Sequence, residues 1–355
     1  MLKNILIFFL ISTSLYAVSL KELLNSIEVT NENYQAQQAL QQMAKKQYES
    51  ASKDNFPTLN LIGAYENNSK VLEHEPEDIL YGELKASYTL YDGGRITNNK
   101  LAKKSLHESQ KFNTQYLKQE IMLDVIREYF SFQNSKSAIE VLNYKINELD
   151  EQIRKSEILV KNDLATKDKL QALIASKKES LYDIETLKID LENSILQLSL
   201  LTGLDILPQD NDKLLEPIYK EEQRYDIEAK KLEAQSLKYN EKMHNYLPTI
   251  SINNSLKKQK YLDYDEIYND KLNNQISLQI NIPIFDFGKI SKDKEASQLE
   301  TLALNKEIEY KEKSIQIERK LALKSLESSK IKLDSAIAAL EATNTTYEFS
   351  KKRFD

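Results

Sequence analysis

Two copies of one sequence pattern lie in this chain, and this duplication constrains the fold more than any other feature. A proline-threonine pair at 57–58 opens an alternating segment, and a second pair at 248–249 opens another. The first segment closes at 91–96 and the second at 285–290, each with an aromatic residue, an aspartate, a glycine, a basic residue and an isoleucine. The prolines lie 191 residues apart (57 and 248), and the aspartates lie 194 apart (92 and 286). A repeat of this length exceeds a solenoid unit and predicts a fold built from two similar halves.

The composition indicates few turns and much helix. The 355 residues include only six glycines, six prolines and no tryptophan, while 29% are charged. The net charge of −6 gives no reason to expect a nucleic-acid partner, which calls for a basic face. The chain has no cysteine, which excludes disulfides, thiolate metal sites and a lipid-anchored N-terminal cysteine.

Residues 1–17 have the pattern of a secretory signal peptide. Lys3 supplies the positive start, an apolar stretch follows from 5 to 15, and Ala17 is the small residue before the expected cut. The alternative, a membrane anchor, is disfavoured because the apolar stretch is too short to span a bilayer comfortably. No other segment of the sequence approaches a transmembrane helix, so a place within a membrane would require strands.

Long helical patterns fill most of the remaining sequence. A helix is expected from 20 to about 54, ending before Pro57. Residues 96–160 contain no glycine or proline, which predicts a rod on the order of 100 Å long. A second helix over 170–201 ends at Gly203, and the two predict an antiparallel hairpin over 94–202 whose returning arm is the shorter. The expected coiled-coil seams comprise Ile139, Leu142, Ile146, Leu149 and Ile153 on the first arm and Leu181, Ile184, Leu187, Leu191, Ile195 and Leu198 on the second.

The duplication divides the chain into parts. We expect a first structural repeat over 18–203, a linker over 204–220 and a second repeat over 221–355. The second repeat contains a helix over 225–246 and a long helix from 290, with apolar residues at heptad-like spacing at positions 326, 333, 337 and 340. The symmetry of the repeats predicts that a tip and a returning helix follow, and these are missing before Asp355. We therefore expect the chain to be a fragment or a truncated product.

Each repeat also carries two segments of period two, which predict β-hairpins over 57–91 and 248–284. Polar loops over about 66–82 and 257–272 would join the two strands of each hairpin. The alternation is clearest in the last strand, whose apolar residues we expect to face lipid: Ile276, Leu278, Ile280, Ile282 and Ile284.

Two interpretations of these strands are open. Alternation is compatible with a soluble antiparallel sheet that has one solvated face. It is also compatible with an outer-membrane barrel, apolar toward lipid and polar toward a water-filled lumen. Export, a mixed polar face and the lack of another apolar element to cover the strands favour the barrel. Because four strands cannot close and open edges are not tolerated in lipid, several chains would have to contribute, and three copies give twelve strands.

The order and spacing of these motifs resemble those of the TolC-type outer-membrane efflux family over essentially the whole mature chain. The resemblance rests on the two hairpins that begin with Pro-Thr, the repeated aromatic-Asp-x-Gly-basic-Ile corner, the Leu-Thr-Gly helix end at 201–203 and the helical tip at 162–166. It implies a fold that is mainly α with transmembrane β. Long antiparallel helical hairpins would form an α-barrel, and four strands per chain would contribute to a trimeric twelve-stranded β-barrel.

The resemblance also implies a location and partners. The family's homotrimer lies in outer-membrane lipid with a long periplasmic extension. It works with a periplasmic adaptor (membrane fusion) protein and an inner-membrane pump of the RND or ABC type. The residues that would form part of the adaptor-docking tip are Lys161, Asn162, Asp163, Leu164, Ala165 and Thr166.

The same resemblance assigns a candidate periplasmic gate. Asp168 matches a family position at which an aspartate helps to hold the periplasmic entrance closed. The alternative for Asp168 is an acid in the first helical turn, which the helix dipole favours. Phe354 falls where some family members carry a gating tyrosine.

Catalytic and cofactor chemistry is not indicated by the sequence. The three histidines are scattered without metal-ligand spacing, and we expect neither an enzyme nor a cofactor. The glycines and arginine at 93–95 could suggest phosphate binding, but they lack the spacing of a P-loop or dinucleotide fingerprint. Strand-to-helix corners that need glycine's conformational freedom explain them better. The residues assigned to these corners are Asp92, Gly93, Gly94, Asp286 and Gly288.

Three functions compete at this point. The leading hypothesis is the outer-membrane channel subunit of a tripartite efflux or type I secretion system, a passive exit duct for drugs, small molecules or polypeptides. The first alternative is a periplasmic adaptor, although adaptors place one hairpin between small glycine-rich β-domains. The second is an exported structural coiled-coil protein without a channel. Predicted lumen residues such as Glu83, Lys85 and Gln279 are mixed in charge and indicate no selective ring.

Overall fold

The computed structural model describes residues 17–69, 76–205, 207–209, 224–262 and 272–354. The expected signal peptide (apart from Ala17), most of the expected linker and the tips of both strand hairpins lie outside these ranges. The chain divides into two compact units, which are described separately. One comprises the described residues up to Met43 together with Gln110–Tyr225, and the other comprises Ala44–Ser109 and the described residues from Asp226 onward.

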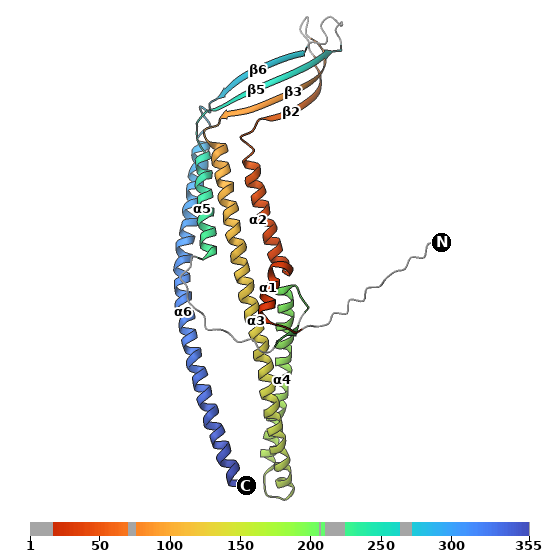
Figure 1. Ribbon diagram of the computed structural model, residues 1–355, viewed down its shortest axis with the longest axis vertical. Coiled ribbons are helices and arrows are strands. Elements are labelled where there is room, and N and C mark those ends of the chain that lie inside the picture. The colour runs from red at the N-terminus through yellow and green to blue at the C-terminus, as the bar shows by residue number, and fades with distance from the viewer. Residues whose placement is uncertain (1–16, 70–75, 206, 210–223, 263–271, 355) are drawn as a thin grey trace, which may run out of the picture. The chain divides into compact units, whose positions relative to one another are not determined.

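Helices account for most of the described chain, and the other main element is one sheet of four strands (Figure 1). The elements in chain order are β1 (Ala17–Val18), α1 (Leu20–Thr30), α2 (Glu32–Ala51), β2 (Thr58–Asn67), β3 (Asp78–Tyr91), α3 (Arg95–Lys161), α4 (Lys167–Thr202), β4 (Leu207–Pro208), α5 (Tyr225–Met243), β5 (Thr249–Tyr261), β6 (Leu272–Asn281) and α6 (Lys289–Phe354).

The first unit has a hydrophobic core between α1, the start of α2, and the facing parts of α3 and α4. Helix α1 begins with a capping box, in which the Ser19 side chain accepts from the Glu22 backbone and the Glu22 carboxylate accepts from the Ser19 backbone. Apolar spacing then places one face of each helix inward, where burial of apolar area stabilises the unit. The buried cluster consists of Leu23, Ile27, Tyr34, Ile121, Val125, Tyr129 and Leu198.

The prediction of one helix over residues 20–54 is wrong, because the structure has two helices separated at Asn31. Asn31 has extended backbone torsions and is almost fully buried. Its side chain donates to the Leu201 carbonyl at 2.7 Å and accepts from the Tyr34 backbone N–H at 2.6 Å. Both hydrogen bonds compensate for the interrupted helix. The bond to Leu201 is tertiary and cannot be predicted from the local apolar pattern, whereas the bond from Tyr34 is a local N-cap of α2.

Helices α3 and α4 form the expected antiparallel hairpin within the first unit (Figure 1). The first arm has 67 residues and the returning arm 36, as the sequence predicts. Small residues allow the arms to approach, and Ser194 Oγ lies 3.2 Å from Ser131 Oγ. Of the predicted seam residues, Leu149, Ile184 and Leu198 are buried, whereas Leu181 is exposed. Gly203 ends α4 in the left-handed conformation, with φ at 68°.

The second unit contains an antiparallel sheet with strand order β2-β3-β5-β6 (Figure 1). Each hairpin pairs its own two strands, and the β3–β5 pair joins the two hairpins. A register shift between Thr89 and Tyr91 marks an irregularity near the end of β3. The strands are longer than the sequence pattern suggested, since β3 begins at Asp78 and β5 continues to Tyr261.

Helices α5 and α6 lie side by side in the second unit (Figure 1). Lys230 Nζ lies 3.1 Å from a Glu307 carboxylate oxygen, and Lys311 Nζ lies 3.3 Å from a carboxylate oxygen of the mostly buried Asp226. Further along α6, the heptad-spaced residues Leu333, Ile337 and Leu340 are exposed in the described chain.

None of the helices in the described ranges is long and apolar enough to cross a membrane. Within the same ranges, no cluster of three or more metal-ligating side chains could hold a metal ion.

Candidate functional site: the sheet and its strand-to-helix corners

One face of the four-stranded sheet is apolar along most of its strands and remains exposed in the single chain. Register pairs bring Leu61 opposite Leu84, and Ile252 opposite both Tyr88 and Leu278. Leu61 is 83% exposed and Leu278 is 62% exposed. An apolar surface of this kind is normally covered by a partner or by lipid.

The opposite face of the sheet is polar. Lys85 pairs with Ser255, and Glu83 pairs with Lys257 in the same ladder. The Ser255 hydroxyl donates to Glu83 Oε1 at 2.7 Å. Gln279 lies opposite Ser251, which lies opposite Thr89, so the predicted lumen residues Glu83, Lys85 and Gln279 share one side of the sheet. The predicted lipid-facing residues within β6, Ile276, Leu278 and Ile280, lie on the other side.

The predicted lipid-facing set is divided by the end of β6. Ile276, Leu278 and Ile280 lie in the strand, while Ile282 and Ile284 follow it because β6 ends at Asn281. Pro283 has no backbone N–H to donate to a ladder, which explains why regular pairing does not continue. All five isoleucine and leucine side chains are exposed.

The first strand-to-helix corner is built around the Asp92 carboxylate. One of its oxygens accepts from the Gly94 backbone N–H at 2.9 Å, and the other accepts from the Ile96 backbone N–H. Asp92 thus satisfies free N–H groups at the start of α3, where the helix dipole also favours a negative charge. Gly93 and Gly94 both have positive φ, as the sequence predicts for a corner that requires glycine.

Arg95 links the first corner to the chain segment that leads into β5. Its Nη1 donates to the Asp92 carbonyl at 2.8 Å and to Thr249 Oγ1 at 3.0 Å. Its Nη2 donates to the carbonyls of Asn245 at 3.1 Å and Leu247 at 2.8 Å. A guanidinium group suits this arrangement because its fixed fork of donors reaches several acceptors at once.

Gly93 packs tightly against the same segment. The Asn245 side chain donates to the Gly93 carbonyl at 3.2 Å. A Cβ added to Gly93 would lie 2.7 Å from both Asn245 Oδ1 and Leu247 Cβ. Glycine is therefore required here for space as well as for its φ of 71°. The contacts of Arg95 and Gly93 with residues 245–249 were not predicted, since no local pattern links positions about 150 residues apart.

The second corner repeats the carboxylate arrangement. Asp286 accepts from the backbone N–H groups of Gly288 at 3.0 Å and Ile290 at 2.8 Å. The Tyr246 hydroxyl also donates to Asp286, at 2.8 Å. The pKa of the Asp286 carboxyl lies below its ordinary value, mainly because the Ile290 N–H stabilises the charged form. The hydrogen bond between Tyr246 and Asp286 raises the pKa of the Tyr246 hydroxyl, because only the protonated hydroxyl can donate to the carboxylate.

The second corner differs from the first in its surroundings. Phe287 occupies the position of Gly93, has a φ of 55° and is 92% exposed. Lys289 occupies the position of Arg95 and, among the described residues, forms a local ion pair with Asp293 Oδ2 at 2.7 Å. A Cβ at Gly288 would meet no atom within 4 Å.

The predicted docking tip forms the turn between α3 and α4. Lys161 ends α3, and residues 162–166 connect it to α4. Asp163 has a φ of 57°, and the Leu164 N–H donates to the Leu159 carbonyl at 2.8 Å. Leu164 is 73% exposed. The docking role of these residues stays a prediction.

The candidate gate residue Asp168 lies exposed in the first turn of α4. This position agrees with both hypotheses, because an acid there is favoured by the helix dipole and is also accessible to a neighbouring helix. The gate role of Asp168 therefore stays a prediction as well.

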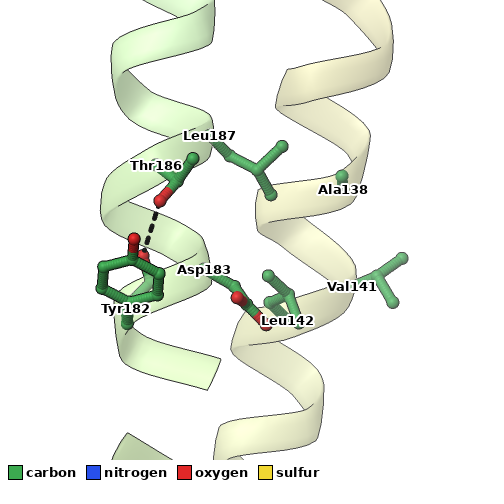
Figure 2. Close-up of a pocket in the computed structure, with 7 residues that line it drawn as sticks. All are labelled: Ala138, Val141, Leu142, Tyr182, Asp183, Thr186 and Leu187. Atoms are coloured by element: carbon green, nitrogen blue, oxygen red, sulfur yellow. Dashed lines mark hydrogen bonds between the residues drawn. The ribbon is translucent and has the colours of Figure 1, made fainter. Parts of the chain in front are cut away.

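An apolar groove lies on the α3–α4 hairpin (Figure 2). It is open to solvent and has a volume of about 590 Å³. Figure 2 shows Leu142 and Leu187 between the two helices, and Thr186 donating to the Tyr182 carbonyl. The full lining is Ala138, Val141, Leu142, Tyr182, Asp183, Thr186 and Leu187. Such a groove is suited to receive another helix.

Comparison with known families supports the resemblance inferred from the sequence. Residues 23–187 match the family model described as outer membrane efflux protein. The chain therefore carries an outer membrane efflux protein domain over these residues, and the predicted family resemblance is confirmed. No curated protein sequence matches the chain.

Solved structures share the fold at low sequence identity. The CmeC outer membrane channel of Campylobacter jejuni matches with a TM-score of 0.80 and 18% identity, over 95% of this chain and 76% of that chain. CusC, whose structures concern folding and transmembrane channel formation, matches with a TM-score of 0.73 and 18% identity, over 84% and 73%. A membrane protein from Pseudomonas aeruginosa matches with a TM-score of 0.73 and 16% identity, over the same shares. The predicted fold class, mainly helical with four strands in one chain, is confirmed.

Proposed function

We propose that this chain, which carries an outer membrane efflux protein domain, is one subunit of a passive exit channel in the outer membrane. The observation that carries the proposal is the sheet in the second unit. Its strands have 10 to 14 residues, enough to cross the hydrocarbon core of a membrane. One face is mainly apolar, the other is polar, and both edge strands lack a partner within the described chain.

Closure of this sheet requires further copies of the chain. Open edges are not tolerated in lipid, because unpaired backbone N–H and C=O groups there cost several kcal/mol each. We infer a homotrimer whose twelve strands form a barrel around a water-filled lumen. The groove on the α3–α4 hairpin would receive a helix of a neighbouring copy, which would extend the channel as a helical barrel into the periplasm.

Transport through this channel is passive, and the energy comes from partners. The similarity to solved outer-membrane channels supports a tripartite assembly with a periplasmic adaptor and an inner-membrane pump of the RND or ABC type. In that assembly the tip from Lys161 to Thr166 docks the adaptor, and Asp168 helps to hold the periplasmic entrance closed. Drugs, small molecules or polypeptides leave through the barrel by diffusion.

The proposal is tested by the mass of the chain after detergent extraction of the outer-membrane fraction. A trimer that conducts ions in a planar bilayer is the expected result. A chain that washes from the membrane without detergent would support the adaptor hypothesis instead. A chain absent from the membrane fraction would support the structural coiled-coil hypothesis.

A pair of arginine substitutions tests the orientation of the sheet. Leu278→Arg places a charge on the apolar face and should cost about 2–4 kcal/mol if that face meets lipid at mid-membrane. Gln279→Arg places the same charge one residue away on the polar face and should leave assembly unchanged. Recovery of folded protein in the outer-membrane fraction measures both. Equal losses for the two variants would overturn the assignment of the faces.

A further inference from the structure

The two repeats place corresponding residues at their corners and at the segments that lead into their first strands. With the corner offset of 194, Lys289 corresponds to Arg95 and Phe287 to Gly93. With the strand offset of 191, Asp54 corresponds to Asn245. The structure therefore contains two corners and two approach segments, which are the residues that lead into β2 and into β5. A contact between one corner and one approach segment can be compared with the corresponding contact of the other corner.

Within the described chain, the first corner contacts the approach segment of the other repeat, whereas the second corner contacts the approach segment of its own repeat, where the Tyr246 hydroxyl donates to Asp286. The first corner meets the approach to β5 through Arg95, which donates to Asn245 and Leu247. This contact accompanies the β3–β5 ladder, which joins the two hairpins. The corresponding ladder for the second corner would join β6 to β2, but these are the two edges of the sheet within one chain.

We propose that the second corner completes the same junction between copies, with Lys289 of one copy paired to Asp54 of the next. The inference rests on the proposed function, because it requires β6 of one copy to lie beside β2 of another. It goes beyond that function by naming the residues that join the copies at the end of the sheet. By internal correspondence, each corner then meets the approach segment of the other repeat, the first within the chain and the second across the interface.

The charges at the two positions are complementary. Asp54 is exposed and presents a carboxylate where the first junction has the neutral side chain of Asn245. Lys289 is 76% exposed, so its ammonium group is accessible to a second chain. Asp54 is also contacted by Asn99 on α3, at 3.4 Å, which holds the carboxylate near the corner of its own repeat. A lysine–carboxylate pair depends on charge rather than on the rigid fork that Arg95 uses.

The residues next to this pair indicate a looser contact than the one inside the chain. At the first corner a Cβ at position 93 would collide with Leu247 and Asn245. Phe287 stands at the corresponding position, so the copies cannot approach as closely. Phe56, which corresponds to Leu247, is exposed as well. An aromatic contact between Phe287 and Phe56 of the next copy would fill the wider gap, and the flexible lysine stem would still reach Asp54.

The internal correspondence also predicts the register between copies. Lys85 lies opposite Ser255 in the β3–β5 ladder. The corresponding pair across the interface is Gln279 with Ala64 of the next copy. The same correspondence pairs Leu278 with Tyr65 of the next copy, so the apolar face continues across the interface. A slip of one residue would place apolar side chains on the polar face, which disfavours registers shifted by an odd number of residues.

A charge-swap experiment tests the proposed ion pair. The variants are Asp54→Lys, Lys289→Glu and the double variant that carries both changes. We expect each single change to lower the temperature at which the detergent-extracted trimer dissociates by several degrees, and the double change to restore most of it. Lys292→Glu is the matched control, because Lys292 lies on the same helix, is equally exposed and pairs with Glu295. This control should leave trimer dissociation almost unchanged.

A disulfide experiment tests the register independently. The chain has no native cysteine, so every crosslink reports the introduced pair. Directly opposed strand residues have the Cα separation that a disulfide needs. Ala64→Cys combined with Gln279→Cys should give covalent dimers and trimers after oxidation. Ala64→Cys combined with Ser277→Cys lies two residues out of register, on the same face, and should crosslink at least tenfold less.

The outcomes separate this inference from the function on which it rests. If the unaltered chain extracts from the outer membrane but is not a trimer, the proposed function fails and the inference fails with it. If the trimer forms but the charge swap restores nothing, the inference is overturned and the channel remains. Crosslinking in the out-of-register variant alone would overturn the register and leave the trimer intact.

Discussion

The two strand-to-helix corners have the same backbone design and different environments. In both, an aspartate accepts from backbone N–H groups at the start of a long helix. The first corner is held by Arg95 against residues 245–249, whereas the second leaves Lys289 and Phe287 exposed. The shared hydrogen bonding of the aspartate is local and follows from the repeated motif. The difference is that the first corner contacts the approach segment of the other repeat, whereas the second contacts Tyr246 in the approach segment of its own repeat.

The largest effect is expected from removal of the Arg95 side chain. Arg95→Ala leaves the carbonyls of Asn245 and Leu247 without their charged donor and should destabilise the first corner by roughly 2–4 kcal/mol. Hydrogen exchange of the Gly94 and Ile96 amides measures the local opening. Lys289→Ala should accelerate exchange at the second corner much less, because its ion pair with Asp293 is exposed. Equal acceleration at both corners would contradict the assigned difference.

Alanine at the corner glycines separates backbone strain from packing. Gly93→Ala combines a positive φ with collisions at 2.7 Å and should cost about 2–4 kcal/mol. Gly288→Ala has a similar φ of 83° but open space around the new Cβ, so it should cost about 1–2 kcal/mol. Thermal unfolding of the two variants provides the measurement. A cost for Gly288→Ala as large as that for Gly93→Ala would mean that packing at the first corner contributes nothing.

Acid should weaken the second corner through Asp286. The pKa of this carboxyl is lower in the folded chain than its ordinary value of 3.8, so the unfolded chain binds the proton more readily. The resulting stabilisation is present in full above that ordinary value and is lost as the pH falls through the lower folded value. The protection factor of the Ile290 amide, its exchange rate compared with the intrinsic rate at the same pH, should fall in this window as the pH is lowered from 5. Asp286→Asn should remove this pH dependence, and its persistence in that variant would assign it to another group.

The smallest effect is expected from Tyr246→Phe. This change removes one hydroxyl donor from Asp286 and leaves the backbone N–H donors of Gly288 and Ile290 in place. It should therefore move the acid midpoint of the second corner slightly upward without changing the first corner. Titration of the Asp286 carboxyl by NMR measures the shift. A downward shift would contradict the assigned hydrogen bond.

Helix α1 and the Asn31 break show where sequence patterns stop being sufficient. Apolar spacing predicts helix from 20 onward, and the helix does form. The interruption at Asn31 depends on the Leu201 carbonyl, which lies 170 residues away along the chain. A local pattern contains no information on such an acceptor. The same reason explains why the partners of Arg95 could not be predicted, although the corner itself could.

The amino-acid sequence by itself determined the duplication, the four strands, the long helical hairpin and the two corners. Each depends on spacing within a few residues: period two for strands, heptad spacing for the helices, and aspartate with glycine for the corners. Only the tertiary structure decided which corner contacts the other repeat, how far β3 and β5 extend and which apolar residues stay exposed. Those properties depend on neighbours that are distant in sequence, since a hydrogen bond or a packed surface exists only once the chain has folded.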